Sequence, residues 1–205
     1  MSHASQSYDF TNPVAAYDEL ARDLGALLSG ERDLIANAAN TAALIYDALP
    51  GLNWAGFYLY KSGELVLGPF QGKPACVRIA LGKGVCGTAA AKRETVVVED
   101  VHAFPGHIAC DSASNSEVVI PLVRNGELLG VLDLDSPNLA RFGSADARGL
   151  EMLAKIFVNS LQELRSTKEN AGEAPASVKQ SLATSPLRGR RTHPSACRCA
   201  ALHLH

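Results

Sequence analysis

Three cysteines, Cys76, Cys86 and Cys110, are the residues of this sequence best suited to chemistry. A thiolate is a strong nucleophile, and surroundings that lower the pKa of the thiol increase its reactivity. Cys110 lies within residues 106–117, where small and turn-forming residues predict a loop. A loop is the least natural place for a cysteine that serves only as a buried apolar side chain. Cys110 is therefore the candidate nucleophile.

The other two cysteines lie upstream in different local contexts. Cys86 lies in residues 84–92, a stretch that begins with glycines and ends in strong helix formers, so we expect it near the start of a short helix, where the helix dipole would lower its pKa. Cys76 begins an apolar run that predicts a strand over residues 76–81. For each of the three cysteines the alternative is a small buried side chain without a chemical role.

Three carboxylates form the second candidate group. Asp133 and Asp135 are two positions apart on one predicted strand and should point to the same face, while Leu132 and Leu134 point to the other. Aspartate is a poor strand residue, so two on one face suggest a cationic ligand. Together with Glu117, they form a candidate site for binding and proton transfer. The alternative is a solvent-exposed face of the sheet.

Trp54 and Tyr58 are four positions apart on another predicted strand, so they also share a face. Gly56 lies between them on that face. The simplest interpretation is ordinary core packing. The alternative is an aromatic wall for a small amphiphilic ligand, with the glycine leaving room for it.

Two other kinds of site are weaker candidates. A metal site would need His102 or His107 together with the cysteines, but the cysteines form no pair with the spacing of a known zinc motif. A cysteine–histidine hydrolase would rest on His107 being near Cys110 in sequence, whereas catalytic partners are usually remote in sequence. We expect both histidines to anchor loops, and we predict no metal and no cofactor.

The elements that must position these residues alternate between helices and hairpins. An Asn-Pro pair predicts a helix start at Pro13, and Asn125-Gly126 between two apolar runs is a strong hairpin signal. This pattern predicts an α+β fold, with a central, mostly antiparallel sheet flanked by helices. The predicted helices cover residues 13–30, 32–48, 84–92 and 144–165, and the predicted strands 54–60, 65–67, 76–81, 96–98, 118–123 and 128–134.

Composition limits the function classes. The 205 residues are 47% hydrophobic and carry a formal net charge of −2, which gives no support for nucleic-acid binding. No apolar run is long enough for a membrane span, and the N-terminal residues do not resemble a signal peptide. Five irregularly spaced cysteines argue against a secreted disulfide framework, so we expect a cytoplasmic protein.

The C-terminal part of the chain differs in composition from the rest. Residues 166–205 contain six lysines or arginines against two glutamates and have no apolar period. Such a segment buries too little apolar surface to offset the entropy cost of ordering. We therefore expect a folded catalytic domain over residues 1–165 and a disordered basic tail over residues 166–205.

Taken together, these motifs resemble the free methionine-(R)-sulfoxide reductases, which are built on the GAF fold. The resemblance covers residues 8–164, and generic GAF modules lack the three-cysteine pattern. The segments that carry it are residues 53–58, 68–76, 82–90, 102–112, 115–117 and 130–136.

The resemblance implies a substrate, free L-methionine (R)-sulfoxide, and a thiol mechanism recycled by thioredoxin. It implies that Cys110 is the nucleophile, Cys76 the main resolving thiol and Cys86 a secondary one. The residues implied to contact the sulfoxide methyl group are Trp54 and Tyr58, and those implied to bind or protonate the substrate are Glu117, Asp133 and Asp135. A homodimer is common in this family. The alternative is a GAF-type module that senses a small molecule or redox state without turnover.

Overall fold

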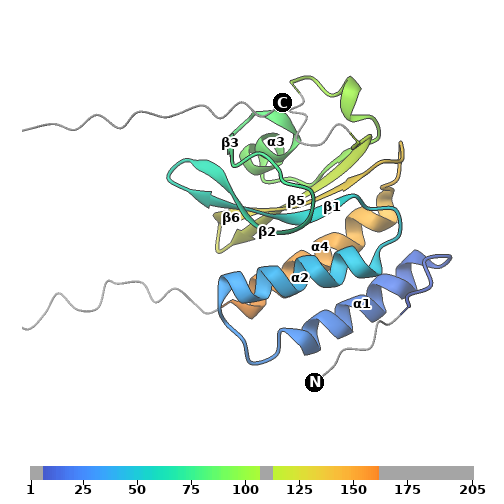
Figure 1. Cartoon of the computed structure of the whole chain (residues 1–205). Coiled ribbons are helices and arrows are strands. Elements are labelled where there is room, and N and C mark those ends of the chain that lie inside the picture. The colour runs from blue at the N-terminus through green and yellow to red at the C-terminus, as the bar shows by residue number, and fades with distance from the viewer. Residues whose placement is uncertain (1–6, 107–112, 162–205) are drawn as a thin grey trace, which may run out of the picture. The chain divides into compact units, whose positions relative to one another are not determined.

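A six-stranded antiparallel sheet carries helices on both of its faces (Figure 1). The structure is a computed structural model that describes residues 7–106 and 113–161. The strands are β1 (Trp54–Lys61), β2 (Glu64–Gly72), β3 (Arg78–Ala80), β4 (Val96–Val98), β5 (Ser116–Arg124) and β6 (Glu127–Ser136), in the order β3-β2-β1-β6-β5-β4. The helices are α1 (Pro13–Leu27), α2 (Leu34–Ala48), α3 (Gly84–Lys92) and α4 (Ser144–Ser160), with a short 3-10 turn at Val101–Ala103. The predicted α+β class is confirmed.

The first two helices begin at side-chain caps. Asn12 accepts a hydrogen bond from the Ala15 backbone N–H, so α1 starts at Pro13 as predicted. Asp33 caps α2 in the same way, and this helix therefore starts two residues later than the sequence indicated. Ile35 of α2 is 51% exposed, and the side of the helix facing the core carries mostly small residues.

The hairpin predicted at Asn125-Gly126 joins β5 and β6, and a second hairpin joins β1 and β2. Asn125 and Gly126 have positive φ angles, as a tight two-residue turn between twisted strands requires. β2 runs to Gly72, well beyond the predicted strand over residues 65–67. A shift in register between β1 and β2 accommodates Pro69, which cannot donate a ladder hydrogen bond.

β3 is shorter than the predicted strand over residues 76–81. It pairs with β2 only from Arg78 to Ala80, so Cys76 lies ahead of the strand and does not begin it. The Leu67 N–H still bonds to the Val77 carbonyl, but Pro74 and the exposed Val77 side chain show why regular pairing does not reach further. Cys76 therefore lies in a connecting segment.

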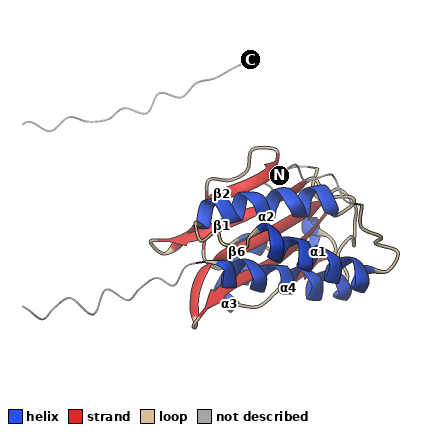
Figure 2. Ribbon diagram, turned by 90° about the horizontal axis from the view of Figure 1, so that it is seen from below, coloured by secondary structure: helices blue, strands red, loops and turns tan. Residues whose placement is uncertain are grey.

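The two faces of the sheet carry separate cores. Helices α1, α2 and α4 cover one face, and α3 lies on the other (Figures 1 and 2). Leu132 and Leu134 of β6 are fully buried on the three-helix side, whereas Val131 packs on the α3 side. α3 covers that face only in part, and this leaves room for a pocket. None of the helices that the structure describes is long and apolar enough to cross a membrane.

Gly56 does not leave room for a ligand, contrary to one of our expectations. A Cβ atom at this position would lie 2.3 Å from the Phe70 Cβ and 2.6 Å from the Trp54 Cη2. The absent side chain instead lets the Phe70 and Trp54 rings stack with centroids 5.3 Å apart. The glycine therefore serves the packing of the aromatic wall.

We expect Gly56→Ala to lower the free energy of unfolding by about 2–3 kcal/mol, because the added methyl group has no space. Urea unfolding of the two proteins measures this difference. Gly25→Ala is the matched control, since a Cβ there meets nothing within 4 Å and an exposed alanine favours the helix. Equal midpoints for Gly56→Ala and the parent protein would contradict the packing described here.

Candidate active site

A pocket lies between α3 and the sheet face opposite the three-helix layer. We call it the carboxylate pocket, because three of its lining residues are acidic. The aromatic pair comes from β1, Glu117 from β5 and the two aspartates from β6. The full lining is Trp54, Tyr58, Pro74, Ala75, Ile79, Lys83, Gly84, Val85, Cys86, Ser114, Glu117, Asp133 and Asp135. The sheet thus brings together all five substrate-binding candidates identified in the sequence.

Strand register explains how the carboxylates meet. Glu117 of β5 is directly opposite Asp135 of β6, and β6 lies between β5 and β1. On its other side, β6 pairs Asp133 with Gly56 and Asp135 with Trp54. The alternation of β6 places both aspartates on the pocket side, as predicted. Directly paired residues have closely spaced side chains, so antiparallel pairing gathers acids and aromatics that are far apart in the chain.

The deepest part of the pocket holds a cluster of Cys86, Glu117 and Asp133. These side chains are at most 6% exposed, and one potential ligand atom from each lies within 4.8 Å of the others. The Cys86 thiol donates a hydrogen bond to Glu117 Oε1 over 3.8 Å. Candidate ligand atoms of Glu117 and Asp133 lie within the same 4.8 Å. Two carboxyl groups this close repel each other when both are ionised, which favours a proton shared between them.

Burial dominates the acid–base properties of this cluster. It raises the pKa of Glu117 well above the usual value, and repulsion from Asp133 and Asp135 raises it further. Burial also raises the pKa of Asp133, to about 6. The Glu117 carboxyl can therefore stay protonated near neutral pH and act as a general acid.

The expected lowering of the Cys86 pKa is wrong. Cys86 is the third residue of α3, where the helix dipole favours a thiolate. Its side chain is buried, however, and burial followed by repulsion from Asp133 and Glu117 raises the thiol pKa instead. The local sequence shows the helix start but not the two carboxylates that β5 and β6 bring against it.

Trp54 and Tyr58 form one wall of the pocket, which was the alternative interpretation of this pair. Their rings stack with centroids 5.9 Å apart, and the Trp54 Nε1 donates to the Lys73 carbonyl over 3.1 Å. Both side chains are almost fully buried, so the core-packing interpretation is correct as well. The aromatic faces that line the pocket are thus held rigidly by their neighbours in the core.

The remaining predicted residues fall into three groups. Cys76 is disulfide-bonded, whereas Cys86 is free, so the partner of Cys76 lies outside the described residues. Cys110 and His107 also lie outside the described residues. His102 Nε2 is 2.9 Å from Asn115 Oδ1, which confirms the expected loop-anchoring role for this histidine.

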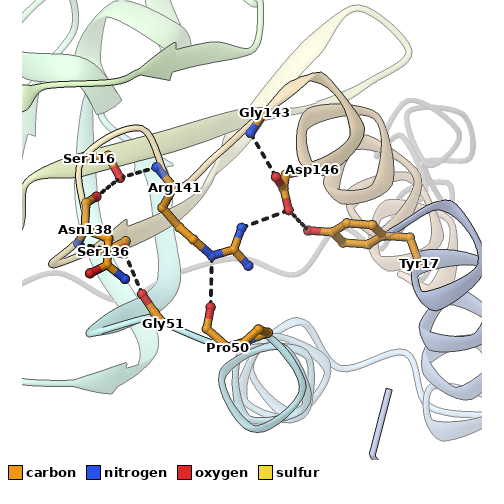
Figure 3. Close-up of polar contacts among 9 residues, drawn as sticks. All are labelled: Tyr17, Pro50, Gly51, Ser116, Ser136, Asn138, Arg141, Gly143 and Asp146. Carbon is orange, nitrogen blue, oxygen red and sulfur yellow. Dashed lines mark hydrogen bonds and ion pairs between the residues drawn. The ribbon is translucent and has the colours of Figure 1, made fainter. Parts of the chain in front are cut away.

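The sequence analysis missed residues that fix the ends of β5 and β6 (Figure 3). Asp146 of α4 accepts hydrogen bonds from the Tyr17 hydroxyl and the Gly143 N–H, and it pairs with Arg141. The Arg141 N–H in turn donates to the Ser116 hydroxyl, beside Glu117. No local pattern could have identified this network, because Tyr17 and Asp146 are 129 positions apart.

Two further contacts complete the framework in Figure 3. The Ser116 hydroxyl donates to the Asn138 carbonyl over 2.7 Å, and the Ser136 hydroxyl donates to the Gly51 carbonyl over 2.6 Å. Ser136 directly follows Asp135 on β6. Buried serine side chains thus hold the two strand ends, and with them the carboxylates of the pocket.

The raised pKa values predict that stability falls as the pH rises. An aspartate with a pKa near 3.8 when unfolded and about 6 when folded binds more protons in the native state between these values. The stabilising, protonated form is fully present below the unfolded pKa and is lost as the pH rises through 6. For Asp133 this loss amounts to roughly 3 kcal/mol.

We therefore expect the stability of Asp133→Asn to depend less on pH between 4 and 7 than that of the parent protein, because asparagine does not titrate. Urea unfolding at a series of pH values measures the slope. Asp18→Asn, at an exposed position of α1, is the matched control and should keep the parent slope. Parallel curves for Asp133→Asn and the parent protein would show that this carboxyl titrates normally.

Comparison with known proteins adds independent information. The GAF domain family model matches residues 12–161. Free methionine-R-sulfoxide reductase of Escherichia coli is 55% identical over 142 residues, which cover 69% of this chain and 86% of that protein. The Saccharomyces cerevisiae protein of the same name is 44% identical over 157 residues, or 73% of this chain and 87% of that protein. The structure of free methionine-R-sulfoxide reductase from Neisseria meningitidis in complex with its substrate is 48% identical, with a TM-score of 0.73, and the match covers 78% of this chain and 95% of that one.

Proposed function

Since the chain belongs to the GAF domain family and, within it, to the free methionine-R-sulfoxide reductases, we propose that it reduces free L-methionine (R)-sulfoxide to methionine through a cysteine sulfenic acid. The observation that carries this proposal is the carboxylate pocket, in which a buried acid, two aspartates and two aromatic rings meet. The Neisseria meningitidis relative, whose structure contains its substrate, supports the substrate class.

The pocket suits both ends of a free amino-acid sulfoxide. Carboxylates of Asp133 and Asp135 can pair with the substrate ammonium group, which exists only in the free amino acid. Trp54 and Tyr58 offer aromatic faces to the methyl group and the sulfur. Because a peptide-bound methionine sulfoxide has no such ammonium group, these carboxylates would favour the free amino acid.

In the proposed reaction, the Cys110 thiolate attacks the sulfoxide sulfur while the Glu117 carboxyl donates a proton to the sulfoxide oxygen. The protonated oxygen then moves to the Cys110 sulfur as the sulfur–oxygen bond of the substrate and the transient sulfur–sulfur bond both break, and methionine leaves with a reduced sulfur. The oxygen remains on Cys110 as a sulfenic acid. The two electrons that reduce the substrate thus come from the thiolate.

A second thiol then resolves the sulfenic acid. We assign this step to Cys76, whose thiolate displaces water from the sulfenic acid of Cys110 and forms a disulfide. The disulfide bond of Cys76 supports this assignment. An external dithiol reduces the disulfide, and thioredoxin is the proposed reductant. This cycle requires a reducing compartment, which favours the cytoplasm as the location.

We assign Cys86 a different role from the secondary resolving thiol that the family resemblance implies. A resolving cysteine attacks as a thiolate, whereas burial and two carboxylates keep the Cys86 proton in place. Its hydrogen bond to Glu117 instead orients the acid. A homodimer, common in the family, remains a prediction.

A substrate assay tests the proposed function. With dithiothreitol as reductant, the purified protein should release methionine from the R but not the S diastereomer of free methionine sulfoxide. It should act poorly on the N-acetyl derivative, which lacks the ammonium group. Comparable rates with both compounds would overturn the proposed ammonium recognition.

The variant Asp135→Asn tests the recognition of the ammonium group directly. It removes one carboxylate from the pocket and should raise KM for the free amino acid about tenfold, as expected when one ion pair is lost. The slow rate with the N-acetyl derivative should not change. If the parent protein binds the sulfoxide but releases no methionine, the alternative of a sensing module without turnover is favoured.

A further inference from the structure

The cluster of Cys86, Glu117 and Asp133 has the composition of a metal site as well as of a proton-sharing network. Three different elements, α3, β5 and β6, each contribute one ligand-type side chain. The three candidate ligand atoms lie within 4.8 Å of one another, and the side chains are 4–6% exposed. These residues therefore converge on one point at the base of the carboxylate pocket.

One oxygen atom of the cluster lacks a hydrogen-bond partner among the described residues. Asp133 Oδ1 is buried and has no hydrogen-bond partner among the described residues, although a buried carboxylate oxygen normally has one. Cys86 Sγ and Glu117 Oε1 are 3.8 Å apart. Two ligands of a tetrahedral Zn²⁺ ion, at about 2.3 Å for sulfur and about 2.1 Å for oxygen, would be about 3.6 Å apart.

The chemistry of the donor set selects the class of ion. One thiolate and two carboxylates suit a borderline cation such as Zn²⁺ better than Mg²⁺ or Ca²⁺, which take oxygen ligands only. Three protein ligands leave the fourth position open toward the pocket. A divalent charge would also offset the repulsion among the buried acids.

We propose that Cys86, Glu117 and Asp133 form a binding site for Zn²⁺ or a similar borderline divalent cation, and that the bound ion excludes the sulfoxide substrate. The exclusion rests on the proposed function, because the ion would bind Glu117, which protonates the sulfoxide, and Asp133, which binds the ammonium group. The binding itself depends only on the geometry of the cluster. Free zinc would then act as a reversible inhibitor.

Cobalt substitution tests the binding. Co²⁺ bound to a thiolate gives a sulfur-to-metal charge-transfer absorption, and Zn²⁺ should abolish it by displacing the Co²⁺ ion. The experiment uses the full chain, reduced, with the substitutions Cys197→Ser, Cys199→Ser, His203→Ala and His205→Ala, which remove candidate ligands in the C-terminal segment. We expect one Co²⁺ per chain with this absorption.

Matched variants in the same background locate the ion. Cys86→Ser should lose the absorption, and Cys110→Ser should keep it. Glu117→Gln retains the thiol and should weaken Co²⁺ binding about tenfold or more. Because this second variant tests the same site, the result does not depend on Cys86→Ser folding correctly. Absorption that survives Cys86→Ser but disappears in Cys110→Ser would overturn the site, as would unchanged binding by Glu117→Gln.

Competition tests the exclusion separately. The Cys110→Ser variant cannot turn over, so methionine sulfoxide can be added without reaction, and it should displace Co²⁺ and remove the absorption. If the absorption persists at saturating sulfoxide, the exclusion is wrong while the metal site stands. If the parent protein fails to release methionine from any sulfoxide, the proposed function is wrong, and the absorption still reports on the metal site.

Discussion

Cys110→Ser should abolish methionine release even in a single turnover without recycling. Only a thiolate at the nucleophilic position can take the oxygen from the sulfoxide, and a serine hydroxyl at neutral pH is far too weak a nucleophile to replace it. We expect a loss of at least about 10³-fold, measured by quantifying methionine after mixing reduced protein with excess (R)-sulfoxide.

Cys76→Ser separates the chemical step from recycling. Because the nucleophile is intact, this variant should release about one equivalent of methionine per chain and then stop. The sulfenic acid left on Cys110 should react with dimedone, and thioredoxin-supported turnover should be lost. Small thiols should still sustain slow turnover, because they can attack the sulfenic acid directly.

Cys86→Ser is the control for both variants. It should retain the single-turnover release of methionine, since its buried thiol is neither nucleophile nor resolving group in the proposed cycle. If Cys110→Ser retains the burst and Cys86→Ser loses it, the nucleophile is the cysteine at the start of α3. The pKa argument for Cys86 would then fail as well.

Glu117→Gln should lower kcat by about 10²- to 10⁴-fold, the range for loss of a general acid. The amide has nearly the shape of the protonated carboxyl and can hydrogen-bond the sulfoxide, but it cannot transfer a proton. KM should change much less than kcat. Steady-state assays with dithiothreitol measure both constants.

The pH profile distinguishes proton transfer from a merely structural effect. In the parent protein, kcat should fall as the pH rises through the raised pKa of Glu117, because only the protonated carboxyl donates. The residual kcat of Glu117→Gln should not show this fall at alkaline pH. Glu127→Gln, at the exposed start of β6, is the matched control and should leave kcat unchanged. A Glu117→Gln variant with near-normal kcat would exclude this glutamate as the acid.

Local patterns determined much of the fold. The cap at Asn12 and the turn at Asn125-Gly126 specify their elements through backbone geometry that only neighbouring residues influence. The alternation of Leu132 with Asp133 and Asp135 determined which face of β6 carries the acids. The errors lie at element ends, such as β3, where pairing with a distant strand decides how far an element extends.

Only the tertiary structure decided the chemical state of the site. The sequence placed Cys86 at a helix start and the carboxylates on a strand face, and both positions are correct. It could not show that β5 and β6 bring Glu117 and Asp133 against that thiol. Burial then raises all three pKa values, and repulsion between groups far apart in the chain raises those of Cys86 and Glu117 further. Residue type and spacing determine which groups a chain carries, whereas desolvation and long-range proximity determine which of them hold a proton.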